Sequence, residues 1–183
     1  MSKILPLRFW DDPVLSTVCD KIEDSEFGPQ LEEFGRELLA TMLDKNGIGL
    51  AAPQVGVLRR MFVMRFPDHE QMGPLVVCNP ALALSGPPLQ EREGCLSLPG
   101  IYEQVTRAGL VTMQYREPSG RTAAELVLPL WDARVAQHEF DHLNGIMFFD
   151  YKDKRSEYGA RMSKQMSRQT MRNWEKERNK RGL

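Results

Sequence analysis

Residues 130–145 read LWDARVAQHEFDHLNG, and this stretch decides most about the fold. Four side chains in it recur at spacings of four, three and four: Trp131, Val135, His138 and His142. Those spacings are typical of one face of an α-helix. They predict a helix over residues 132–143, with Asp132 as N-cap and Asn144 with Gly145 as the stop. Because two histidines share a face with apolar residues, we expect the histidine face to be buried.

The two histidines are the first sign of chemistry. His138 and His142 lie one helical turn apart, so both imidazoles can bind one metal ion. Glu139, between them, is placed to move protons for a water at that metal. The alternative is a pair of ordinary core or surface histidines. Zinc peptidases with this motif usually take a third ligand from downstream, but no histidine follows His142.

Cys95 is the better candidate for the third ligand. It lies in residues 93–97, Glu-Gly-Cys-Leu-Ser, between Gly and Pro residues that predict a tight, exposed turn. One Cys and two His leave the fourth position of a tetrahedral site open for water. The alternative for Cys95 is a small buried apolar residue, which is what we expect for Cys19 and Cys78. We expect His69 to be a solvated loop residue.

The rest of the chain predicts one α+β domain. Leu31, Phe34, Leu38 and Met42 recur at helical spacing. They predict a helix over residues 30–45, with Asp24 or Ser25 near its start. Short β-type segments punctuated by Pro and Gly follow, at residues 61–66, 75–77, 105–115 and 125–128. Residues 117–120 predict the hairpin turn between the last two, and a third helix is expected over residues 158–178.

The composition and the cysteine count of the 183-residue chain limit the class of protein. Its composition, 42% hydrophobic and 27% charged, is ordinary for a globular protein. Three widely spaced cysteines argue against a disulfide framework and favour a reducing, cytoplasmic setting. We find no signal-peptide pattern and no apolar run long enough to span a bilayer, so no membrane role is expected.

Three segments together resemble the signature motifs of the peptide deformylase family. They are residues 47–54 (GIGLAAPQ), 93–97 (EGCLS) and 137–142 (QHEFDH), in the family's order. The similarity covers about residues 4–151. It implies antiparallel β-sheets around a central metal-binding helix, plus a C-terminal helix. Residues 1–151 would then form the catalytic domain, and residues 152–183 a basic helical extension of it.

The resemblance also implies a reaction and the residues for it. Family members hydrolyse the N-formyl group of the N-terminal formyl-methionine of new polypeptides, releasing formate. Carried over, the metal ligands are Cys95, His138 and His142, the general acid/base is Glu139, and the donors to the formyl oxygen are Gln54 and the Leu96 N–H. One divalent metal is implied, most often Fe²⁺ in cells, although Ni²⁺, Co²⁺ or Zn²⁺ can occupy such a site. The residues expected to bind substrate are Gly47, Ile48, Gly49, Glu93, Gly94, Trp131 and Val135.

Three positions depart from the family's pattern. Leu130 stands where many members have glycine before the catalytic helix. Arg134 stands where a small apolar pocket residue is common. Tyr102 occupies a region where some members carry a substrate-binding arginine. These departures concern the shape of the pocket rather than the metal site.

Parts of the sequence also fit other classes of protein. Residues 47–52 also fit a GxGxxA dinucleotide fingerprint, but that motif needs a strand before it and a helix after it. A generic zinc endopeptidase lacks its downstream ligand here. Residues 152–183 carry 11 Lys+Arg and 4 Asp+Glu on a chain of net charge −1. That tail is either a solvated helix or a helix that docks on ribosomal RNA. Docking is compatible with catalysis, so our hypothesis is an enzyme with a tethering tail.

Overall fold

The structure is a computed structural model and describes residues 2–123 and 125–152. Its helices are α1 (Pro29–Asp44) and α2 (Leu130–Leu143), and its strands are β1 (Gly49–Ala51), β2 (Met61–Met64), β3 (Leu75–Cys95), β4 (Leu98–Arg116) and β5 (Leu126–Pro129). Short 3₁₀ turns are η1 (Pro13–Ser16), η2 (Asp24–Glu26), η3 (Ala52–Val55), η4 (Glu70–Met72) and η5 (Phe148–Lys152). The strands form one antiparallel sheet in the order β1-β2-β3-β4-β5. The predicted α+β class is confirmed.

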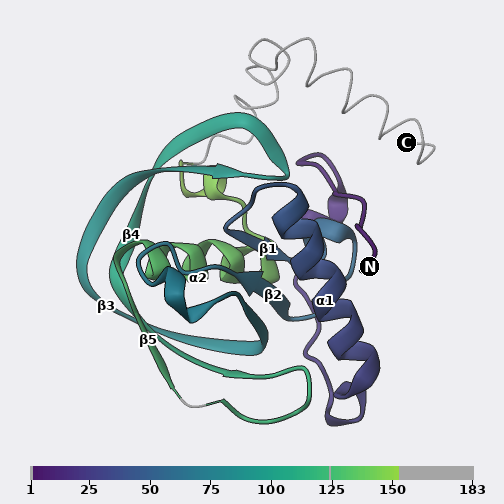
Figure 1. The fold of residues 1–183 in the computed structure, drawn as a ribbon. Coiled ribbons are helices and arrows are strands. Elements are labelled where there is room, and N and C mark those ends of the chain that lie inside the picture. Colours follow the sequence, from purple (N-terminus) through teal and green to yellow (C-terminus); the bar gives the residue numbers. More distant parts are fainter. Residues whose placement is uncertain (1, 124, 153–183) are drawn as a thin grey trace.

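Helix α2 lies in the middle of the molecule, and the sheet curves around it (Figure 1). The largest core cluster forms between them, where Ala133, Val135 and Ala136 of the helix meet apolar residues of β2 to β5. Small side chains on this face let the helix approach the sheet closely. The helix that carries both histidines is therefore held on several sides, which suits a site that needs fixed ligands.

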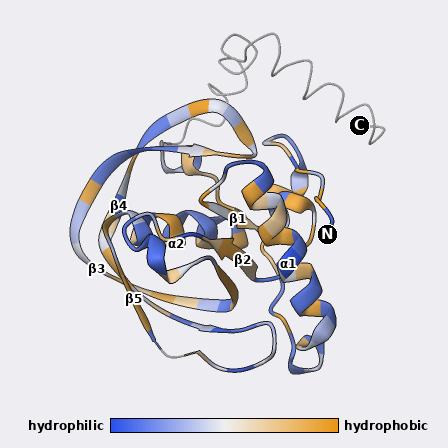
Figure 2. Ribbon diagram, in the orientation of Figure 1, coloured by the Kyte–Doolittle hydropathy of each residue, from blue (hydrophilic) through white to orange (hydrophobic). Residues whose placement is uncertain are grey.

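Helix α1 covers another part of the sheet. Leu38 and Met42 of its predicted stripe are fully buried against Leu50 and Val63. A Cβ at Gly35 would lie 3.0 Å from Val76 and 3.1 Å from Met61, so the helix backbone sits almost directly on β2 and β3. Figure 2 shows apolar residues on β1, β2 and one side of α1.

Strands β3 and β4 form the long hairpin that carries the cysteine motif. Irregularities in their register at residues 78–81, 85–88 and 94–95 let the hairpin bend around α2. Cys95 pairs with Leu98, so the hairpin closes through a two-residue turn, Leu96 and Ser97. Cys95 itself is half-buried rather than exposed, because that turn folds toward α2.

Several local predictions need correction. The N-cap of α1 is Gly28, not Asp24 or Ser25, which belong to the separate turn η2. Asp132 is not the N-cap of α2, since Pro129 holds that place and the Asp132 carboxylate accepts a bond from the Asp68 N–H. Strand β3 runs eighteen residues past the segment predicted at 75–77, because a sheet partner satisfies its polar stretch.

Two further outcomes concern the ends of elements. Asn144 and Gly145 end α2 as predicted, Gly145 with φ +69°. The histidine face of α2 is not buried over its whole length, since Trp131 at its N-terminal end is 39% exposed. The helix predicted at 158–178 lies outside the described residues. Within residues 2–123 and 125–152, no helix is long and apolar enough to cross a membrane.

Candidate metal centre and pocket

Cys95, His138 and His142 come together at one point between the β3–β4 turn and helix α2. Their ligand atoms all lie within 4.8 Å of one another, and Cys95 Sγ is 3.4 Å from His142 Nε2. Sulfur and nitrogen ligands around one tetrahedral ion lie about 3.6 Å apart. Burial lowers the pKa of His142 well below its usual range and keeps the imidazole neutral, as metal binding requires. The three side chains therefore fit a divalent metal.

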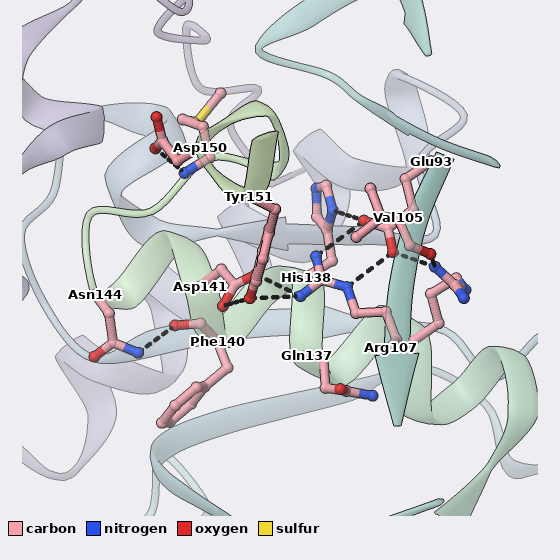
Figure 3. Close-up of polar contacts among 12 residues, drawn as sticks. Glu93, Val105, Arg107, Gln137, His138, Phe140, Asp141, Asn144, Asp150 and Tyr151 are labelled. Atoms are coloured by element: carbon pink, nitrogen blue, oxygen red, sulfur yellow. Dashed lines mark hydrogen bonds and ion pairs between the residues drawn. The ribbon is translucent and has the colours of Figure 1, made fainter. Parts of the chain in front are cut away.

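The ring of His138 is oriented from behind by Glu93. Its Nδ1 lies 3.0 Å from Glu93 Oε2, which leaves Nε2 for the metal. Glu93 is held in turn by Nε and Nη2 of Arg107, both at 2.9 Å (Figure 3). Burial opposes the ionisation of Glu93, but the hydrogen bonds from Arg107 and His138 outweigh it and hold the pKa of this carboxyl well below its usual range. Glu93 therefore stays ionised and can accept a hydrogen bond from Nδ1 of His138.

Glu139 has one carboxylate oxygen, Oε2, that is buried and without a hydrogen-bond partner among the described residues. The other oxygen lies against Gly49 of β1, where any Cβ would overlap it. Burial raises the pKa of Glu139 to about 7. A carboxyl group with such a pKa can both accept and donate a proton near neutral pH.

Gln54 is fixed with its amide nitrogen toward the cysteine. Its Oε1 accepts from the Ala51 N–H at 2.8 Å, and its Nε2 donates to Ser97 Oγ at 3.1 Å and to Cys95 Sγ at 3.3 Å. It is only 1% exposed, so the amide is held before any ligand arrives. Leu96 follows the cysteine in the hairpin turn and lines the same cavity.

A cavity of about 440 Å³ opens beside two of the three predicted ligands, Cys95 and His138. All seven residues predicted to bind substrate line it: Gly47, Ile48, Gly49, Glu93, Gly94, Trp131 and Val135. Gln54, Cys95, His138 and Glu139 line it as well. Segments that are far apart in the sequence thus meet at one cavity of the size of small-ligand sites.

Two of the three departures from the family pattern, Arg134 and Tyr102, also line this cavity. Arg134 lines its wall, 4% exposed, and donates to Glu93 Oε1, Val105 O and Leu89 O. Tyr102 lies over Gly94, where a Cβ would be 2.6 Å from its ring. Leu130 begins α2 with a left-handed φ of +46°. Glycine at that position would adopt this φ without strain.

Three polar residues behind the site were not singled out from the sequence: Arg107, Asp141 and Tyr151. Arg107 joins Glu93 to Asp141, with Nη1 2.5 Å from Asp141 Oδ2. Asp141 lies inside the histidine motif, and this is the sequence feature from which it could have been identified. Arg107 and Tyr151 lie on other elements, so the register of the hairpin and the position of η5 were needed to find them.

The fold and the site are those of an α+β hydrolase in which Cys95, His138 and His142 could hold one divalent metal beside a cavity. Residues 4–158 match the family described as polypeptide deformylase. The chain belongs to this family. It is 39% identical over 160 residues to the peptide deformylase of Thermus thermophilus, covering 80% of this chain and 81% of that protein. It is 38% identical over 151 residues to that of Synechocystis sp., covering 81% and 79%.

Solved structures agree with the assignment. The peptide deformylase of Ehrlichia chaffeensis superposes with a TM-score of 0.80 at 30% identity, over 88% of this chain and 96% of that one. A Met-Ala-Ser-bound class I type b enzyme from Acinetobacter baumannii gives a TM-score of 0.73 at 34% identity, over 82% and 99%. The predicted fold and family are therefore confirmed.

Proposed function

We propose that this chain hydrolyses the N-formyl group from the N-terminal formyl-methionine of newly synthesised polypeptides and releases formate. The observation that carries the proposal is the grouping of Cys95, His138 and His142. Cys95, His138 and Glu139 line one cavity, and Glu139 Oε2 is buried with no hydrogen-bond partner in the part of the chain that the structure describes. Family membership supports the same reaction.

The metal would be held by Cys95 Sγ and by one ring nitrogen each of His138 and His142. When bound, a divalent ion supplies Lewis acidity, which polarises a carbonyl group and makes a water more acidic. We expect Fe²⁺ to be the bound ion in cells, and Ni²⁺, Co²⁺ or Zn²⁺ to be able to replace it. A thiolate with two imidazoles suits all four ions.

The remaining steps belong to the protein's own side chains. Glu139 takes a proton from the attacking water and delivers it to the departing amine, a role that a pKa of about 7 supports. The Nε2 group of Gln54 and the Leu96 N–H donate to the formyl oxygen as charge develops on it. Donors fixed in advance are worth about 3 kcal/mol each in such sites.

The cavity would take the methionine side chain that follows the formyl group. Trp131 and Val135 supply apolar wall, and Glu93 and Gly94 form the adjoining strand edge. The backbone of residues 47–49 would pair with the extended peptide, since glycine there allows a close approach. Selection of methionine rests on this cavity because the formyl group itself is small.

Residues 1–151 would form the catalytic domain, and residues 152–183 a basic extension of it. We infer a cytoplasmic enzyme whose extension docks on the ribosome through its Lys and Arg residues. Deleting residues 152–183 should leave turnover of a small formyl-Met peptide intact and weaken ribosome binding in a salt-dependent way. Ribosome binding that the deletion leaves unchanged would disprove the docking role.

Formate release from formyl-Met-Ala-Ser tests the proposed reaction. The full chain is purified anaerobically with Fe²⁺, or loaded with Ni²⁺, beside Glu139→Ala, Cys95→Ser and the exposed control Glu91→Gln. We expect turnover in the wild type and the control, none in Glu139→Ala with its metal still bound, and loss of metal in Cys95→Ser. A metal-loaded wild type that releases no formate would overturn the proposal.

A further inference from the structure

Tyr151 connects the turn η5 to the charged side chains behind the candidate metal centre (Figure 3). Its hydroxyl donates to Asp141, 3.0 Å from Oδ1 and 2.9 Å from Oδ2, and accepts from Arg107 Nη1 at 3.2 Å. The Arg107 guanidinium carbon also lies 5.0 Å from the centre of the Tyr151 ring. Tyr151 is 54% exposed, yet its oxygen is engaged with two buried charged groups.

These contacts continue without a break to a predicted metal ligand. Arg107 binds Asp141 through Nη1 at 2.5 Å and Glu93 through Nε and Nη2 at 2.9 Å. The second oxygen of Glu93 then lies 3.0 Å from His138 Nδ1. The side chains of Arg107 and Glu93 are 3% and 4% exposed, so water does not compete for these bonds.

The same contacts also reach the second histidine through the backbone. Asp141 directly precedes His142 on α2, so the Tyr151 hydroxyl is bonded to the helical turn that carries this ligand. A hydrogen bond to the nitrogen that faces away from a metal fixes the orientation of an imidazole ring. A side chain can therefore influence metal binding without contacting the metal, by fixing the residues that hydrogen-bond to the ligand histidine.

We propose that Tyr151 is a positioning residue that holds His138, through Asp141, Arg107 and Glu93, in the orientation that metal binding requires. Among the residues that the structure describes, removing the hydroxyl leaves Arg107 as the side-chain partner of Asp141. Arg107 can then shift toward Asp141 and loosen its two bonds to Glu93. This inference rests on the proposed metal-dependent deformylation, but it is tested by metal retention as well as by turnover.

Tyr151→Phe is the variant of choice because it removes the oxygen and keeps the ring beside Arg107. Tyr115→Phe is its matched control, a half-buried tyrosine of β4 that packs on the core rather than lining the cavity. Both full-length variants and the wild type are loaded with Co²⁺. The measurements are the visible spectrum of the cobalt, its rate of loss to a chelator, kcat and KM for formyl-Met-Ala-Ser, and the thermal midpoint of the metal-free protein.

We expect Tyr151→Phe to lose cobalt about 3–10-fold faster than the control, with a changed cobalt spectrum, a lower kcat and an unchanged KM. A spectrum and loss rate equal to those of Tyr115→Phe would overturn the positioning role, whatever the thermal midpoints are. A wild type that binds cobalt but releases no formate would instead refute the proposed function. In that case the rates of cobalt loss from Tyr151→Phe and Tyr115→Phe would still test the positioning role of Tyr151.

Discussion

Arg134 Nη1 lies 2.5 Å from Glu93 Oε1, while the other oxygen of the same carboxylate lies 3.0 Å from His138 Nδ1. The Glu93 carboxylate therefore binds both Arg134, which lines the cavity, and His138, a predicted metal ligand. Arg134 also donates to the backbone oxygens of Val105 and Leu89. One buried guanidinium thus ties α2 to both strands of the long hairpin.

Arg134→Leu should destabilise the protein markedly. The change removes one of two arginines from the buried Glu93 carboxylate and deletes the hydrogen bonds from Arg134 to two carbonyl oxygens. The free energy of unfolding should fall by about 3 kcal/mol, toward the low end for a broken buried ion pair because Arg107 remains. Urea unfolding of the metal-free protein measures this, with Arg92→Leu, an exposed arginine of the cavity rim, as control. Equal stability of the two variants would contradict the argument.

The sequence was sufficient for the parts of the site that are local. Helical spacing of His138 and His142 and the turn around Cys95 identified side chains that the fold brings together. Arg107 could not be found in this way, because its bond to Glu93 crosses a hairpin with irregular register. Asp132 was misplaced for a related reason. Its partners, Asp68 and His69, lie on a loop more than sixty residues away, and His69 Nδ1 is 2.5 Å from its carboxylate.

Gly49→Ala should disable catalysis while metal binding is retained. A Cβ at this position overlaps the Glu139 carboxylate, which must turn away from the site. Displacing a reacting group by about 1 Å can cost roughly 100-fold in rate, so we expect a loss of that order in formate release. Bound metal is measured on the same samples by elemental analysis.

Gly47→Ala is the matched control for that change. Its Cβ would lie 2.9 Å from Leu96 Cδ1, the far end of a flexible side chain, 3.2 Å from Met42 Cγ and 3.3 Å from the backbone oxygen of Gly49, so much smaller shifts relieve these contacts than at Gly49. We therefore expect a clearly smaller loss of turnover than in Gly49→Ala. Similar losses in the two variants would mean that close backbone approach to substrate, rather than room for Glu139, explains both glycines.

The three cysteines should differ in reactivity in the metal-free protein. Burial raises the pKa of Cys19 to about 11 and that of Cys78 to about 12, whereas Cys95 is half-buried and lines the cavity. Iodoacetamide at pH 8 should therefore label Cys95 first, and bound Ni²⁺ should protect it. Peptide mass analysis of the labelled protein gives the order. Faster labelling of Cys19 or Cys78 would contradict it.

The same thiols predict a loss of stability in alkali. Burial raises the pKa of Cys19 and of Cys78 above the ordinary value of a thiol, so above about pH 9 the unfolded chain releases protons from these two thiols that the native chain keeps. The stabilising contribution is complete below pH 9 and declines as the pH rises toward 11. In Cys78→Ala the thermal midpoint should fall less steeply between pH 9 and 11 than in the wild type. Parallel curves would show that Cys78 does not contribute.

Leu130→Gly should stabilise the protein, although it deletes an apolar side chain. Leu130 has a φ of +46° and is 55% exposed, so it combines a strained backbone with little burial. Relief of the left-handed strain outweighs the greater flexibility of glycine in the unfolded chain, and the free energy of unfolding should rise by about 0.5–1 kcal/mol. Leu130→Ala is the control, since it removes the side chain and keeps the strain. If both variants unfold at the same urea concentration, the backbone at residue 130 is not the source of the difference.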